Sequence, residues 1–185
     1  DPTGFLGDSQ HVSIDVGRTT IHEVGALGVG WRGWQARNYR RSDYSRPFDE
    51  SSSATAGGIP LLAGLARREE FAAGVIEHAL LISGPASDRH RWPARGSDGQ
   101  HPSHPLEYGD RLVLREDVAE ELLAELDDPN SRAVVVCLRD YGAHLNDRTG
   151  LEIDAPANIR LVMDRDVAVH VPGLPYTSFP VRRQP

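Results

Sequence analysis

Two segments near the start of the chain alternate between apolar and polar residues. HVSIDV (11–16) and TTIHEV (19–24) have a period of two, which is typical of strands that bury one face. Gly17 and Arg18 separate them, and a Gly-X pair between two strands predicts a hairpin with a type II′ turn. In the register that places Ser13 opposite His22, one face carries Val12, Ile14, Val16, Thr19, Ile21 and Glu23, and the other carries His11, Ser13, Asp15, Thr20 and His22.

The stretch from Gly25 to Ser53 has no regular period and is rich in Gly, Arg, Ser and aromatic residues. This composition predicts a long loop, or loops around short strands, and long ordered loops are commonly functional. The aromatic residues either form a flat, cationic stacking surface with the arginines or cover the core like a lid. The residues concerned are Trp31, Trp34, Tyr39 and Tyr44, interleaved with Arg32, Arg37, Arg40 and Arg41.

The rest of the chain predicts strands and short helices in turn. Residues 67–73 favour a helix that ends at Gly74, and VIEHALLI (75–82) is apolar on both faces, which indicates a central strand. DRLVLR (110–115) predicts another strand, and Asp117 with Glu120 predicts a capping box before the helix VAEELLAEL.

Residues 132–141 predict a helix that ends at Gly142, although Val134–Val136 would also suit a strand. The segments LEID, IRLVMD and VAVHV near the end of the chain have the pattern of short strands. The whole pattern predicts a mainly β fold, a jelly-roll-like β-sandwich with two or three short helices, built as a single domain of residues 1–185.

Composition narrows the classes of partner. The net charge of −7 disfavours nucleic acid, since phosphate binding needs a basic surface. No apolar run approaches the roughly 18 residues of a membrane span, so no membrane partner is expected. The one cysteine, Cys137, lies in the apolar run AVVVCL and is expected to be buried, without a nucleophilic role.

The predicted hairpin holds the first candidate site residues. His11, Asp15 and His22 share its polar face, where they could act as an acid/base pair with an orienting group or as metal ligands, or could be ordinary solvated residues. Glu23 lies on the apolar face, where burial would raise its pKa as a general acid requires, unless it is an edge residue. His78 lies between apolar residues of a strand, either as a structural core histidine or as a catalytic one.

The stretch HRWPARGSDGQHPSHP (90–105) has neither a helical nor a strand period. Trp92, Arg95 and Asp98 combine an aromatic plane with a guanidinium and a carboxylate, which suits sugar-ring stacking and hydroxyl or carboxylate capture; a proline-stiffened surface loop is the alternative. His90, His101 and His104 do not have the spacing of a known zinc motif. Since GxSxG, P-loop and CxxC motifs are also lacking, the sequence predicts neither a metal nor a cofactor.

Several blocks of the chain together resemble a largely uncharacterised family of secreted, β-rich bacterial proteins of the actinobacterial type. These blocks are HVSIDV…TIHEVGA, GIPLLAGLARREEFAAGVIEHAL, RWPARGSDG, YGDRL and LRDYGAHLND, which span roughly residues 8–150. The resemblance implies export and a β-rich fold more than it implies an activity. The matching positions include His11, Glu23, His78, Trp92, Asp98, Tyr141 and Asp147.

The chain departs from that family pattern in two places. Family members carry further strands before the HVSIDV position, whereas ten residues precede it here, and they have a tyrosine at the position of His22. The first departure indicates a fragment that lacks N-terminal strands, or a sheet edge through which the protein self-associates.

These observations lead to one functional hypothesis and one alternative. The first is an exported, extracellular carbohydrate-active protein, a hydrolase or lyase of an acidic or cell-wall polysaccharide that works by general acid/base chemistry. The alternative is a non-catalytic glycan-binding or structural subunit of an extracellular assembly. The predicted catalytic residues are His78, Glu23 and His11, and the predicted substrate-binding residues are Trp92, Arg95, Asp98 and Tyr141.

Overall fold

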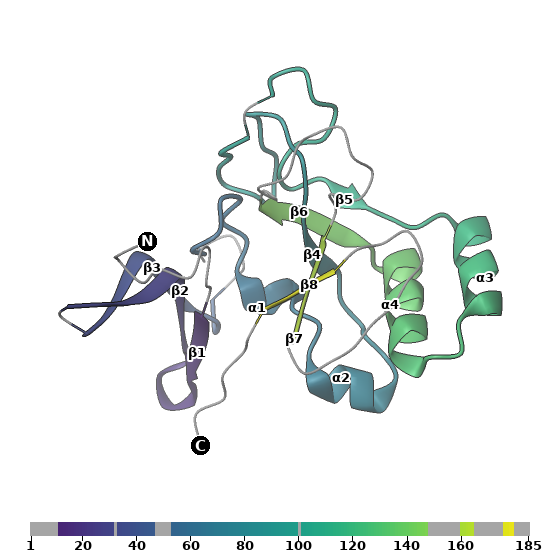
Figure 1. The fold of residues 1–185 in the computed structure, drawn as a ribbon, viewed down its shortest axis with the longest axis horizontal. Coiled ribbons are helices and arrows are strands. Elements are labelled where there is room, and N and C mark those ends of the chain that lie inside the picture. The colour runs from purple at the N-terminus through teal and green to yellow at the C-terminus, as the bar shows by residue number, and fades with distance from the viewer. Residues whose placement is uncertain are drawn as a thin grey trace.

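The computed structural model describes residues 11–31, 33–46, 53–99, 101–147, 160–164 and 176–179. These residues form two β-sheets and a few short helices (Figure 1). The first sheet is antiparallel and has the order β1 (His11–Asp15), β2 (Thr20–Gly30) and β3 (Gly33–Asp43).

The second sheet is mixed and has the order β5 (Arg111–Leu112), β6 (Ala143–Asp147), β4 (Leu80–Ser83), β7 (Arg160–Asp164) and β8 (Tyr176–Phe179). The pairs β4–β6 and β7–β8 are parallel, and the other pairs are antiparallel. The helices are α1 (Leu61–Gly64), α2 (Arg68–Ala73), α3 (Glu116–Glu125) and α4 (Pro129–Asp140). No helix among the described residues is long and apolar enough to cross a membrane.

The fold is therefore mixed and rich in sheet, which agrees with the coarse prediction from the sequence. A jelly-roll-like sandwich is not confirmed. Its strands would pair antiparallel throughout, whereas β4 and β6 run parallel and are joined through β5, α3 and α4. The hydrophobic core lies around β4 and α4, where Leu80, Leu81, Val134 and Leu145 are among the buried residues.

The predicted register of the first hairpin is confirmed, because Ser13 pairs with His22 and Ile14 pairs with Ile21. The predicted two-residue turn is wrong. The chain instead forms a 3₁₀ turn over Val16–Arg18, in which the side chain of Asp15 accepts a hydrogen bond from the backbone N–H of Arg18.

The prediction of a long loop after Gly25 is also wrong. Residues 20–43 form one long hairpin of two 11-residue strands, β2 and β3, which extends from the body of the molecule (Figure 1). The outer part of this hairpin carries exposed apolar side chains, among them Val29, Trp31 and Trp34, and so lacks the alternation of a strand that buries one face. The aromatic side chains of this region do not cover the core like a lid, because all four are exposed: Trp31, Trp34, Tyr39 and Tyr44.

Most of the predicted helices and strands are confirmed with shifted ends. Helix α2 ends at Gly74, which has a φ of 72°, and α4 is the helix predicted over residues 132–141. The capping box at Asp117 is wrong, since Arg115 is the N-cap and Asp117 lies in the first turn of α3. Strand β4 begins only at Leu80, β5 is two residues long, and β7 covers most of IRLVMD, whereas LEID and VAVHV lie outside the described residues.

The prediction that Cys137 is buried is confirmed. Its Sγ lies 3.2 Å from the carbonyl oxygen of His78, to which it can donate a hydrogen bond. Burial, together with the negative charges of Glu70 and Asp140, raises the pKa of the Cys137 thiol to about 12. A thiol in this environment is an inert part of the core.

Candidate functional site

Glu23 is fully buried and holds two chain segments together. Its Oε1 accepts a hydrogen bond of 2.7 Å from the backbone N–H of Leu61, and its Oε2 accepts one of 3.2 Å from that of Ala54. Burial raises the pKa of the Glu23 carboxyl against the opposing effect of hydrogen bonds from Ser53, Leu61 and Ala54. Because both oxygens are occupied and the side chain is 0% exposed, Glu23 has no access to a polysaccharide.

His11 is not brought together with Glu23. His11 pairs with Val24, and Val12 pairs with Glu23, in the antiparallel ladder between β1 and β2. Since neighbouring side chains on a strand point to opposite faces, His11 and Glu23 lie on opposite sides of the sheet.

His78 lies just before β4 and has both ring nitrogens at acceptor atoms. Its Nδ1 is 3.0 Å from the carbonyl oxygen of Ala79, and its Nε2 is 3.0 Å from Oε1 of Glu70. A ring nitrogen that donates to an acceptor in the protein is not free to take a proton from a ligand. The arrangement indicates a structural histidine that joins α2 to the chain leading into β4.

An open cavity of about 610 Å³ lies beside this histidine. It is lined by Arg67, Glu69, Glu70, Ala73, Val75, Glu77 and His78. Burial alone would raise the pKa of Glu70, but hydrogen bonds from Arg67 and the charge of His78 outweigh this effect, so its pKa lies below the ordinary value. The Glu70 carboxylate therefore pairs with both Arg67 and His78.

We expect His78→Ala to lower the free energy of unfolding by about 1–2 kcal/mol, because Glu70 and the carbonyl of Ala79 each lose a hydrogen-bond partner. Urea unfolding followed by circular dichroism measures the change. Glu77→Ala, an exposed neighbour in the same cavity, serves as the control and should change stability little. Unchanged stability in His78→Ala would contradict the structural role.

The predicted ligand-binding residues have a different setting. Trp92, Arg95 and Asp98 lie together on the long connection between β4 and β5, in the part that spans residues 87–110, here called the Trp92 loop. This loop occupies the top of Figure 1. All three side chains are exposed, and Trp92 exposes 73% of its surface.

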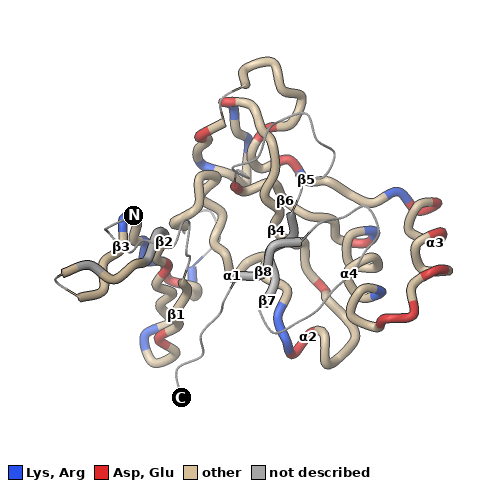
Figure 2. The backbone as a smooth tube through the Cα atoms, viewed as in Figure 1, with Lys and Arg blue, Asp and Glu red and all other residues tan. Residues whose placement is uncertain are grey.

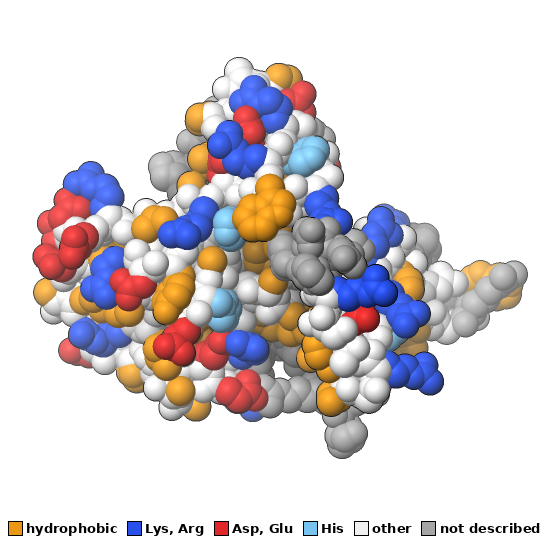
Figure 3. All heavy atoms as spheres, turned by 180° about the vertical axis from the view of Figure 1, so that it is seen from behind, with side chains coloured by type: hydrophobic (Ala, Val, Ile, Leu, Met, Phe, Trp, Pro, Cys, Tyr) orange, Lys and Arg blue, Asp and Glu red, His pale blue; other side chains and the backbone are white. Residues whose placement is uncertain are grey.

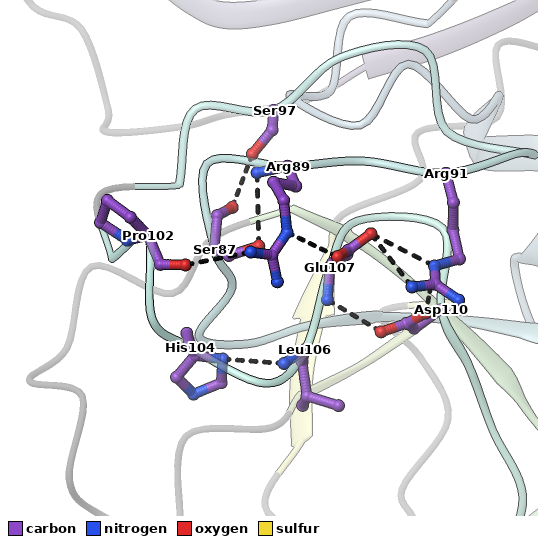
Figure 4. Close-up of polar contacts among 9 residues, drawn as sticks. All are labelled: Ser87, Arg89, Arg91, Ser97, Pro102, His104, Leu106, Glu107 and Asp110. Carbon is purple, nitrogen blue, oxygen red and sulfur yellow. Dashed lines mark hydrogen bonds and ion pairs between the residues drawn. The ribbon is translucent and has the colours of Figure 1, made fainter.

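Ion pairs join the two branches of the Trp92 loop (Figure 4). Nε of Arg89 lies 2.6 Å from Oε1 of Glu107, and Nη2 of Arg91 lies 3.1 Å from Oε2 of the same carboxylate. Nε of Arg91 also lies 2.9 Å from Oδ1 of Asp110. The hydrogen bond from Arg89, reinforced by Arg91, holds the pKa of Glu107 below its ordinary value. Trp92 therefore directly follows Arg91, whose side chain forms ion pairs with two carboxylates.

Two side-chain hydroxyl groups and a close approach at a glycine fix the same loop from inside. The hydroxyl of Ser97 donates 2.8 Å to the carbonyl oxygen of Ser87, and the hydroxyl of the fully buried Tyr108 donates 2.8 Å to Oδ1 of Asp98. A Cβ atom at Gly99 would lie 1.9 Å from the carbonyl oxygen of Ser87, so only glycine permits this approach.

The residues on each side of Trp92 are anchored as well. The backbone N–H of Arg91 donates 2.9 Å to the carbonyl oxygen of Tyr108, and that of Arg95 donates 2.8 Å to the carbonyl oxygen of Gly57. Gly109 has a φ of 92°, and a Cβ there would lie 1.9 Å from the carbonyl oxygen of Arg91. The loop thus presents an exposed indole from a backbone that is held on both sides.

Tyr141 is not brought to this loop. It is the C-cap of α4, just before β6 begins, whereas the Trp92 loop meets the middle of β6, where the N–H of Gly109 donates to the carbonyl oxygen of Leu145. Four residues of strand separate these two places, which is on the order of 13 Å.

His144 is a site residue that the sequence did not indicate. It lies on β6, is half-buried, and its Nδ1 is 3.0 Å from the carbonyl oxygen of Gly109 at the base of the Trp92 loop. Since a carbonyl oxygen only accepts, Nδ1 is the donor in this contact. In the sequence, only the alternation of apolar and polar residues in AHLND indicates to which face of the strand this side chain points.

The remaining histidines do not form a metal site in the part of the chain that the structure describes. Nδ1 of His104 accepts a hydrogen bond of 3.2 Å from the backbone N–H of Leu106. Among the described residues, no group of three or more His, Cys, Asp or Glu side chains is arranged to hold a metal ion.

Comparisons with protein-family models, with curated proteins and with solved structures found no match to this chain. The resemblance to secreted bacterial proteins therefore stays a prediction from the sequence.

Proposed function

We propose that this protein is a glycan-binding module that holds a polysaccharide on the Trp92 loop. The observation that carries the proposal is the 73% exposure of Trp92 on a loop fixed by the Arg89–Glu107, Arg91–Glu107 and Arg91–Asp110 ion pairs. What distinguishes Trp92 from the other exposed tryptophans is that an arginine and a carboxylate, Arg95 and Asp98, are exposed on the same ordered loop.

The chemistry of the loop suits a sugar ring. The C–H face of a pyranose packs against an indole, which offers a large, flat, apolar area. Arg95 can donate to sugar oxygens or to a carboxylate, and the carboxylate of Asp98 can accept from a hydroxyl group. Seen from the side opposite to that of Figure 1, the lobe that this loop forms carries arginine, acidic and histidine side chains at its surface (Figure 3).

Rigidity of the loop contributes to affinity. A loop that is ordered before binding avoids the cost of immobilising its side chains, which is about 0.5–1.5 kcal/mol for each one. The bonds of Arg91, Tyr108 and Ser97 within the loop supply this order.

Binding is favoured over cleavage by the surroundings of the candidate catalytic residues. A glycosidase needs two carboxyl groups about 5–9.5 Å apart on either side of the bond, and a lyase needs a free base. Glu23 is sealed in the core and both nitrogens of His78 are occupied within the protein. The proposal keeps the expectation, drawn from the sequence resemblance, that the protein is exported.

Native affinity electrophoresis tests the proposal. The purified chain is run through gels that contain xylan, β-glucan, galactomannan or polygalacturonate, and the same polysaccharides are assayed for new reducing ends and for unsaturated products. We expect retardation in at least one gel without product. Release of product from any of them would establish an enzyme instead, and a folded chain that none of the four retards would contradict glycan binding.

A further inference from the structure

One face of the long hairpin of β2 and β3 continues beyond the core that it covers. Ile21 and Glu23 lie on this face and are buried. Val29 follows Glu23 by six residues and pairs with Trp34 across the hairpin, so both side chains lie on the same face. They are 54% and 68% exposed, respectively. We call the face of Ile21, Glu23, Val29 and Trp34 the inner face; it is buried near the body and exposed towards the tip.

The exposed part of the inner face is apolar, with a cation at its base. Ala36 follows Trp34 by two residues and is exposed as well, and Arg40 lies four residues further along β3 on the same face. The exposed side chain of Arg40 donates 2.9 Å to the carbonyl oxygen of Tyr39, but in the described part of the chain it forms no ion pair. Residues 24–42 contain four arginines and neither Asp nor Glu. The hairpin beyond the core therefore combines exposed apolar side chains with positive charge.

A surface of opposite charge lies along α3. Residues 116–128 contain seven acidic side chains, all exposed, and no basic one (Figure 2). Glu121 and Glu125 are one turn apart on the same helix face, and neither forms an ion pair with another described residue. Val118 and Leu122 belong to the same stripe of the helix and are only half-buried. This face of α3 thus offers carboxylates beside apolar surface.

The two surfaces of one molecule cannot meet each other. The hairpin and α3 lie on opposite sides of the body, so the hairpin can reach only the α3 of another molecule (Figure 1). Because both surfaces belong to the same chain, two copies are complementary in charge where they would touch. The net charge of −7 opposes this contact only weakly, since charges more than about 8 Å apart are largely screened at physiological ionic strength. A second copy is therefore the partner that both surfaces fit.

We propose that the inner face of the hairpin docks on α3 of a second copy of this chain. Val29 and Trp34 pack against the half-buried apolar positions of α3. Arg40 pairs with Glu121 and Glu125. Two copies that lie side by side in opposite directions form this contact twice, about a two-fold axis. The proposal goes beyond glycan binding, because the Trp92 loop belongs to neither surface.

Sedimentation velocity over a range of protein concentrations tests the contact. We expect the wild type to form dimers or larger assemblies, and Trp34→Ser to weaken association by at least about tenfold. Arg40→Glu and Glu121→Arg/Glu125→Arg should each be monomeric, whereas an equimolar mixture of the two should associate again, because each then meets the opposite charge on its partner. Arg111→Glu changes the charge of an exposed residue of β5 and should associate as the wild type does. Circular dichroism checks that every variant is folded.

Three results would overturn the proposal. A wild type that stays monomeric at every concentration would exclude the contact, and a mixture of the two charge-reversed variants that fails to associate would exclude α3 as the partner surface. A monomer that binds phosphatidylcholine vesicles, with the binding abolished in Trp34→Ser, would identify a lipid surface instead. Glycan binding is tested separately, because Trp92→Ala should associate as the wild type does and Trp34→Ser should keep its affinity for a soluble oligosaccharide.

Discussion

Glu23→Ala is expected to lower the free energy of unfolding by about 3 kcal/mol, one of the largest effects available in this chain. The substitution leaves the buried N–H groups of Leu61 and Ala54 without their acceptor and opens a cavity where the side chain was. It also releases β2 from the segment that leads into α1. Urea unfolding of the two proteins, followed by tryptophan fluorescence, measures the difference.

The pH dependence of this loss identifies its cause. Because the pKa of Glu23 is raised above 4.5, the group's contribution to stability is full below that value and declines as the pH rises through the raised pKa. The difference between wild type and Glu23→Ala should therefore be larger at pH 4 than at pH 8. Glu121→Ala, an exposed glutamate of α3, is the matched control. A loss of unfolding free energy below about 1 kcal/mol at both pH values would contradict a stabilising role for the buried hydrogen bonds of Glu23.

Trp92→Ala is expected to weaken glycan binding by about 2 kcal/mol or more, which is about thirtyfold in Kd. The indole is the largest apolar surface of the loop, and no other residue of the loop offers a comparable plane for a sugar ring. Isothermal titration with the polysaccharide that retards the protein most strongly measures the change. The stability of the folded chain should stay within about 0.5 kcal/mol, since Trp92 is mostly exposed.

Trp34→Ala provides a matched control for this prediction. Trp34 is 68% exposed, close to the value for Trp92, but it lies on β3 and on the side of the strand opposite to Tyr39. It should bind the glycan as the wild type does. If both tryptophan variants lost affinity equally, the binding surface would be the hairpin or the whole exterior, and the Trp92 loop would not be the site.

The sequence predicted the parts of the fold in which one face is buried. The register of β1 and β2 followed from alternation, because Ile21 and Glu23 must point inward together while His22 points outward. Helices α2 and α4 followed from their glycine ends. The long arm of β2 and β3 was missed because apolar side chains such as Val29 and Trp34 are exposed on it, and because it contains Gly25, Gly28 and Gly30, a residue type that is depleted in strands.

The candidate site was predicted in part, for a related reason. Trp92, Arg95 and Asp98 are close in the chain, so their residue types alone indicated a shared loop. The partners that fix this loop were not predictable, since Glu107 is 16 and 18 residues away from the two arginines that it binds. His78 and Glu23 had the residue types of a catalytic site, but their polar atoms form hydrogen bonds with other groups of the protein. The sequence does not show these partners.

The most direct test of glycan binding at the Trp92 loop is a titration followed by the indole N–H resonances in a ¹H–¹⁵N NMR spectrum. The chain has three tryptophans, Trp31, Trp34 and Trp92, and each is identified by its loss in a Trp→Phe variant. Cellohexaose, xylohexaose, mannohexaose and trigalacturonate are added in turn. The account predicts that the Trp92 resonance shifts saturably with at least one of them while Trp31 and Trp34 stay in place. A Trp92 resonance that no oligosaccharide moves, from a folded protein, would contradict it.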